Sequence, residues 1–83
     1  MVGECYICKR YGPCDVHHVL SGPFRAKADK LGLTIPVCRT CHSAIHATPE
    51  RYRYLKAEAQ EKAMRDQGWT VAEFIAEFGR NYF

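Results

Sequence analysis

The sequence has no long apolar segment, since its longest uninterrupted apolar run is only a few residues. A membrane-spanning helix needs about 20 such residues, so the sequence predicts no membrane association. The first residues also lack the apolar stretch of a secretory signal peptide, and we expect a cytoplasmic protein. Internal repeats, low-complexity stretches and an obvious linker are missing too. With 83 residues, the chain is predicted to form a single small domain.

Apolar residues make up 47% of the chain and charged residues 25%, which indicates a folded rather than a disordered protein. A core of this size is marginal, and small domains often add a metal or disulfides. Five cysteines and four histidines provide the ligands. Because a reducing compartment disfavours disulfides, cysteines in pairs indicate a metal site.

The net charge is only +3, and all of the excess lies in residues 1–47, which also hold every Cys and His. Residues 48–83 carry as many acidic as basic side chains. Positive charge around a metal site suits a polyanion such as nucleic acid. An excess this small is equally ordinary for a protein without such a partner.

Two cysteine pairs have the spacing of a zinc site. Cys5 and Cys8, like Cys38 and Cys41, are separated by two residues, which lets both thiolates of a pair reach one ion about 2.3 Å away. Together they predict a closed site with four sulfur ligands that holds structural zinc. Cys14 is left over, and we expect it to be a small buried side chain.

Turn residues and apolar patterns divide residues 1–47 into short elements. We expect a metal-binding turn over 4–15, strands over 16–20 and 33–37, a basic loop with a helical turn over 24–32, and a knuckle leading into a short helix over 38–47.

Residues 48–83 are predicted to form a helical extension. Thr48 and Pro49 suit the start of a helix that runs to Gln67, and Thr70 with Glu73 suits a capping box for a last helix ending at Gly79. The expected apolar faces consist of Tyr52, Leu55, Ala59 and Ala63, and of Val71, Phe74, Ile75 and Phe78. Such faces belong to the core more often than to a partner surface. The fold class is therefore a small zinc-stapled α+β domain.

The four histidines are confined to two of these elements. His42 and His46 are four residues apart on the expected helix, so they share a face and can bind one ion, while Cys41 points elsewhere. His17 or His18 can add a third ligand, which leaves the other as a base. Neighbouring strand residues point to opposite faces, so both act in one site only if the strand twists or bulges.

These residues resemble the HNH nuclease family with its ββα-metal finger. The resemblance covers about residues 5–47 and is carried by the two cysteine pairs, by Asp15 to Val19, and by Ile35 to His46. It implies a DNA endonuclease that leaves 5′-phosphate and 3′-hydroxyl ends. It implies His18 as the general base, and a catalytic divalent metal on His17, His42 and His46.

The implied ion is Mn²⁺, Mg²⁺, Ni²⁺, Co²⁺ or Zn²⁺, and imidazole ligands favour the ions other than Mg²⁺. We expect a backbone carbonyl to orient the imidazole of His18. The Asn at the centre of the family motif falls on Leu33 here, so Thr34 or another contact has to brace the loop between the strands.

The C-terminal residues 68–82 resemble a narrower subgroup, the phage recombination-enhancement (Ref-type) nucleases, which cut DNA at sites bound by RecA filaments. This implies RecA-coated DNA, or another phage or bacterial protein, as a partner in the cytoplasm of a bacterial or phage-infected cell.

Basic residues beside the histidines are candidates for phosphate contacts, and no recognition helix is evident, which predicts low sequence specificity. The candidates are Arg25, Lys27, Lys30 and Arg39. Two alternatives remain open: a non-catalytic zinc module that binds nucleic acid or protein, and one metal site with mixed Cys and His ligands.

Overall fold

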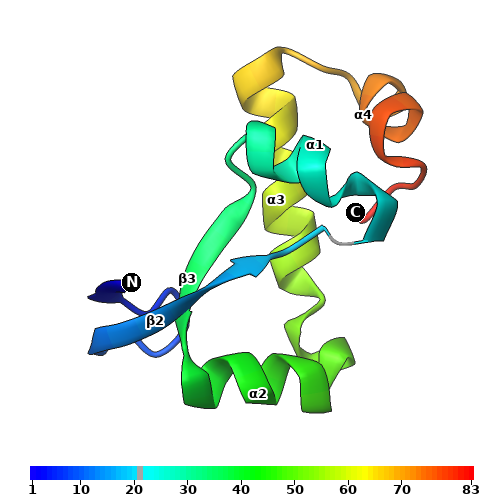
Figure 1. Cartoon of the computed structure of the whole chain (residues 1–83). Coiled ribbons are helices and arrows are strands. Elements are labelled where there is room, and N and C mark those ends of the chain that lie inside the picture. Colours follow the sequence, from blue (N-terminus) through cyan, green and yellow to red (C-terminus); the bar gives the residue numbers. More distant parts are fainter. Residues whose placement is uncertain (21) are drawn as a thin grey trace.

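The computed structural model describes residues 1–20 and 22–83 of the chain (Figure 1). Within them, a three-stranded antiparallel sheet in the order β1-β2-β3 is combined with four α-helices and two 3₁₀ turns, η1 and η2. In chain order the elements are β1 (Val2–Glu4), β2 (Tyr11–His18), η1 (Gly22–Phe24), α1 (Arg25–Lys30), β3 (Thr34–Cys38), α2 (Arg39–Ala47), η2 (Pro49–Tyr52), α3 (Tyr54–Gln67) and α4 (Val71–Phe78). The predicted α+β class is confirmed.

The two halves of β2 pair with different strands. Residues 11–13 pair with β1, whereas residues 14–18 pair with β3. The predicted first strand is therefore wrong at both ends, because it was placed at 16–20 and the strand begins at Tyr11 and ends at His18. The expected turn over 4–15 therefore extends too far, and Pro13 is tolerated in the strand because β2 has only one neighbour there.

The short strand β1 was not predicted. It has only three residues, two of them exposed, so it leaves no alternating apolar pattern in the sequence. It pairs with the first residues of β2 and ends directly before Cys5. Beside it, the backbone N–H of Cys14 donates to the carbonyl of Met1 at 2.8 Å.

Strand β3 leads from α1 at one end of the hairpin to α2 at the other (Figure 1). Backbone hydrogen bonds brace the loop before it: the N–H of Leu33 donates to the carbonyl of Ala28 at 2.8 Å, and that of Gly32 to the carbonyl of Asp29 at 3.1 Å. Leu33 itself is buried in the core. A turn of backbone hydrogen bonds and this apolar side chain therefore hold the loop in place.

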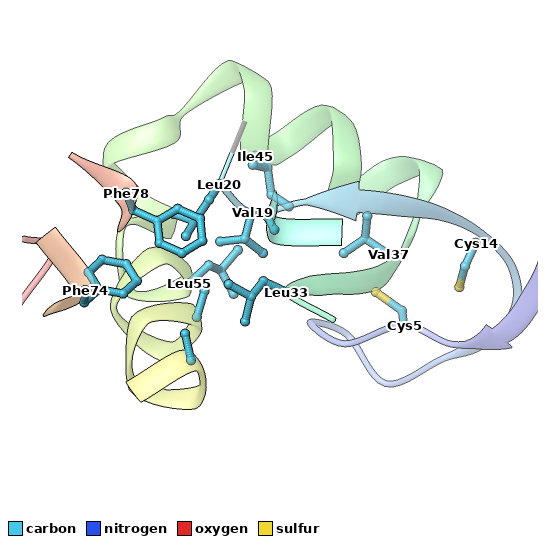
Figure 2. Close-up of a cluster of buried hydrophobic side chains, with 13 residues drawn as sticks. Cys5, Cys14, Val19, Leu20, Leu33, Val37, Ile45, Leu55, Phe74 and Phe78 are labelled. Carbon is cyan, nitrogen blue, oxygen red and sulfur yellow. The ribbon is translucent and has the colours of Figure 1, made fainter. Parts of the chain in front are cut away.

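The buried core runs from sulfur to aromatic side chains. Figure 2 shows Cys5 and Cys14 at one end, Phe74 and Phe78 at the other, and aliphatic residues such as Leu33 between them. The aromatic rings of α4 stack with centroids 4.9 Å apart. The C-terminal helices therefore complete the same core that the cysteine region begins.

The predicted helix from Thr48 is divided into η2 and α3. Thr48 does not cap it, because its hydroxyl instead donates to the carbonyl of Ala44 at 3.0 Å and so closes the end of α2. On α3 the residues Leu55, Ala59 and Ala63 are buried as predicted. Helix α4 begins with the predicted capping box of Thr70 and Glu73 and ends at Gly79, whose φ of +83° suits glycine.

None of the helices in the part of the chain that the structure describes is long and apolar enough to cross a membrane.

Candidate metal centres

The four paired cysteines form one cluster. The sulfur atoms of Cys5, Cys8, Cys38 and Cys41 all lie within 4.8 Å of one another, although 29 residues separate the two pairs in the sequence. The sulfurs of Cys8 and Cys38 are 3.8 Å apart. A tetrahedral zinc with Zn–S bonds of about 2.3 Å requires sulfurs roughly 3.8 Å apart. The cluster therefore fits a structural zinc ion, as the spacing predicted.

Backbone N–H groups support this cluster in both knuckles. The N–H of Cys8 donates to the sulfur of Cys5 at 3.5 Å, and the N–H of Cys41 to that of Cys38 at 3.4 Å. In the first knuckle the chain reverses at Lys9, whose φ of +67° is unusual for a residue other than glycine. In the second, Cys38 is the N-cap of α2, so its sulfur faces the positive end of the helix.

Ionisation differs across the cluster. Burial raises the pKa of Cys5, but hydrogen bonds from the backbone of Cys38, Cys8 and Ile7 outweigh it and lower that pKa to about 6. Burial and the neighbouring thiols raise the pKa of Cys41 to about 12. Cys5 therefore loses its proton more readily than Cys41. A bound divalent cation stabilises the thiolate form of each cysteine, so metal binding is coupled to proton release.

Cys14 stays outside the cluster. It is 5% exposed, its thiol lies 3.5 Å from the carbonyl of Gly3, and burial raises its pKa. The prediction of a small buried side chain is confirmed.

Three histidines form a second, separate cluster. The ring nitrogens of His17, His42 and His46 lie within 4.8 Å of one another, and the ring centroids of His42 and His46 are 4.9 Å apart. Helix α2 supplies two of the rings and β2 the third. Because the cysteines and histidines form distinct groups, the structure does not favour a single site with mixed ligands.

Helix α2 serves both clusters because adjacent helical residues point about 100° apart. Cys41 turns toward the sulfurs, whereas His42 and His46 turn toward His17. This is the arrangement that the spacing of Cys41, His42 and His46 predicted.

Asp15 braces the histidine cluster. Its Oδ2 atom lies 3.1 Å from Nδ1 of His42, and its Oδ1 atom is 4.0 Å from Arg39. The hydrogen bond with His42, supported by Arg39, lowers the pKa of Asp15, so the group is a carboxylate. When Nδ1–H of His42 donates to this carboxylate, Nε2 is left to bind a metal, which is a common arrangement around metal-bound histidines.

The His17 ring is suited to ligation because it is neutral. Burial, followed by the nearby rings of His42 and His46, lowers the pKa of His17 to about 4. A metal ligand has to be deprotonated, and this histidine already is at neutral pH.

His18 lies outside this cluster but lines the same cleft as His17 and His46, which has a volume of about 200 Å³. Register between β2 and β3 is continuous through His18, so the bulge that we considered is not there. Both histidines reach the cleft because it opens at the end of the strand, where His18 is the last residue.

The partner of His18 differs from our expectation. Its Nε2 atom lies 3.4 Å from the carboxylate of Asp29 on α1, whereas we expected a backbone carbonyl. Asp29 is 66% exposed, so this contact orients the ring more than it adds stability.

The four predicted phosphate contacts have different surroundings. Arg25 and Lys30 are exposed at the two ends of α1, and Arg39 is 90% exposed beside Asp15. Lys27 instead contacts α4, because its ammonium lies 2.7 Å from the carboxylate of Glu77 and donates to the Glu77 carbonyl at 2.9 Å. Three of the candidates are thus free to meet a phosphate, and Lys27 joins two helices.

Sequence reasoning missed Asp15 and Asp29. Asp15 could have been found, because it lies two residues before His17 and residues i and i+2 of a strand share a face. Asp29 had no such signal, since its approach to His18 depends on how α1 folds back.

The chain matches no family model, no curated protein and no solved structure. Its function therefore has to be inferred from the chemistry of these two clusters.

Proposed function

We propose that the protein is a metal-dependent DNA endonuclease with low sequence specificity. The observation that carries this proposal is the three-histidine cluster, two of whose members, His17 and His46, line a cleft together with a fourth histidine, His18. The cysteine cluster lies at the start of the same helix, which supplies Cys41 to it. In this proposal β2, β3 and α2 correspond to the ββα-metal finger of the HNH family, and His17, His42 and His46 hold the catalytic cation.

Held by His17, His42 and His46, a divalent cation would supply stabilisation of the negative charge that develops as the phosphodiester bond breaks. The protein prepares its ligands beforehand: His17 is neutral, and Asp15 fixes the orientation of His42. Imidazole nitrogens suit Zn²⁺, Ni²⁺, Co²⁺ or Mn²⁺ better than Mg²⁺.

His18 acts as the general base. When its Nε2–H donates to Asp29, Nδ1 is free to accept a proton from water. The oxygen of that water attacks phosphorus, the bond between phosphorus and the 3′ oxygen breaks, and the 3′ oxygen takes a proton from solvent. The products carry a 5′-phosphate and a 3′-hydroxyl.

A non-catalytic zinc module is the other candidate, but the three histidines and their carboxylate brace have no use in it. RecA-coated DNA is a further proposed substrate, which rests on the resemblance of residues 68–82 alone.

A plasmid-nicking assay across Mn²⁺, Mg²⁺, Ni²⁺, Co²⁺ and Zn²⁺ tests the proposal. We expect nicking to require a second metal ion in addition to one zinc per chain, and to fail in His18→Ala. The assay is run with and without RecA filaments. One zinc per chain and no nicking with any metal would favour the non-catalytic module.

A further inference from the structure

A second cleft lies next to the histidine cleft. It has a volume of about 410 Å³ and is formed by η2, the start of α3 and the last residues of the chain, Arg80 to Phe83. Pro49 and Lys56 line both clefts, so the two are neighbours on the surface. We call it the tail cleft.

Cations predominate in the tail cleft. Arg53, Lys56 and Arg80 line it and are exposed, and the one acidic side chain lining it among the described residues is Glu50. The net charge of residues 48–83 is zero, so this local excess is not apparent in the sequence. It arises because the chain end folds back onto α3.

The ring of Tyr82 holds two of these cations together. Nζ of Lys56 is 5.6 Å from its centroid, and the guanidinium carbon of Arg80 is 5.2 Å from it. A cation within about 6 Å of an aromatic face is attracted to it. Two like charges that would otherwise repel are therefore kept close to each other.

The wall that carries Tyr82 is anchored in the core. Gln60 is fully buried, its Nε2 donates to Oδ1 of Asn81 at 2.8 Å, and its Oε1 accepts from the backbone N–H of Tyr82 at 2.6 Å. The Tyr82 ring also meets Phe74 edge-on, with centroids 6.3 Å apart. Because both polar atoms of this buried amide bond to Asn81 and Tyr82, they fix the position of the tail cleft relative to α3.

We infer that the tail cleft binds backbone phosphates of the DNA strand next to the bond that is cut, with Arg53, Lys56 and Arg80 as the contacts. This inference rests on the proposed function. Because the tail cleft adjoins the histidine cleft, a strand cut there would pass over it, and phosphate contacts of this kind position a substrate without reading its sequence.

The test compares two triple variants of the zinc-loaded full chain that lose the same charge. Arg53→Gln, Lys56→Gln and Arg80→Gln remove the cations of the tail cleft. The control replaces Arg10, Lys62 and Arg65, which are basic residues that do not line it, by Gln. Binding of a fluorescein-labelled DNA duplex is measured by anisotropy across a salt series, and nicking is measured in parallel.

Each neutralised phosphate contributes about 0.9 to the slope of log affinity against log salt. We expect the tail-cleft triple to lower that slope by about 2.7 and the control to change it little. The double variant Arg53→Gln with Arg80→Gln leaves Lys56 beside the histidines intact, and we expect it to lower the slope by about 1.8.

Equal slopes for the two triples, with the wild type still cutting, would overturn the tail cleft and leave the nuclease proposal standing. A wild type that binds the duplex but cuts with no metal would refute the nuclease proposal, and the same pair of triples would still decide on the tail cleft.

Discussion

Two neighbouring residues of α2, Cys41 and His42, belong to ligand clusters of opposite character. The cysteine cluster has four sulfurs, backbone N–H donors in both knuckles and buried Cys5 among its members. The histidine cluster has three nitrogens, a carboxylate brace and a cleft with a further histidine. The first has the four ligands that complete a structural zinc site, and the second has three ligands, which would leave a position open on a bound ion.

Under the proposed function, the difference explains how so short a chain would support a reactive site. A small core contributes little stability, so the cysteine cluster has to hold the scaffold. Because Cys41 and His42 are consecutive residues of α2, a metal that fixes Cys41 also fixes the position of His42. The predictions below separate the clusters experimentally, beginning with the largest effect.

The largest effect is expected from Cys8→Ser. Structural zinc contributes on the order of 10 kcal/mol to folding in small metal domains, which is comparable to the whole stability of such a domain. The variant should lose its zinc and its cooperative thermal transition, measured by metal analysis and circular dichroism. Cys14→Ala is the matched control, because Cys14 is buried outside the cluster. A zinc-free Cys8→Ser protein with wild-type stability would rule out a structural site.

The next effect separates His17 from His18. His18→Ala should keep both metals and DNA binding but lose about 10²–10⁴-fold in rate, because it removes the general base. His17→Ala should lose affinity for the second metal, and excess Mn²⁺ should restore part of its activity. Calorimetric titration of metal into each variant measures the difference.

Two results would contradict these roles. If His18→Ala loses the second metal and His17→Ala keeps it, the ligand and the base are exchanged. If both variants remain fully active, the hydrolytic mechanism fails.

Much of this comparison could be predicted from residue spacing. Ligand pairs such as Cys38 with Cys41, and His42 with His46, are local, so the geometry of one turn or one helix fixes them. The same holds for the capping box of α4 and for the burial of Leu55 on α3. Where a feature depends on a few neighbouring residues, the sequence was sufficient.

The remaining features depend on contacts between distant segments. β1 is stabilised by pairing with β2 and not by a pattern of its own. Thr48 suited either the end of one helix or the start of the next, and its hydroxyl bonds backwards to Ala44. Asp29 reaches His18 only because α1 folds onto the hairpin. Spacing along the chain carries no information on such contacts.

A moderate effect is expected from Asp15→Asn. Replacing the partner of a metal-bound histidine typically lowers metal affinity about 10–100-fold. The Asp15 side chain bonds to His42, which belongs to the histidine cluster and not to the cysteine cluster, so binding of the second metal should weaken while the zinc is retained. Asp29→Asn is the matched control: it contacts His18, which is not in the cluster, and should lower the rate without changing metal affinity. Equal metal affinity in Asp15→Asn and wild type would show that the brace is dispensable.

The smallest effects concern α1, the helix that carries Asp29 toward the histidine cleft. Lys27 is paired with Glu77, and an exposed ion pair contributes at most about 1 kcal/mol. Lys27→Gln should therefore lower the melting temperature slightly and leave the salt dependence of DNA binding unchanged. Arg25→Gln should do the reverse, with no loss of stability and a slope lower by about 0.9, because Arg25 is exposed and free to contact a phosphate. Thermal melts measure the stability of the two variants, and anisotropy titrations across a salt series measure the slope of log affinity against log salt. A lower slope for Lys27→Gln would contradict this prediction. It would mean that the Lys27 ammonium of the wild type leaves Glu77 to contact DNA, and that the DNA-binding surface covers the whole of α1.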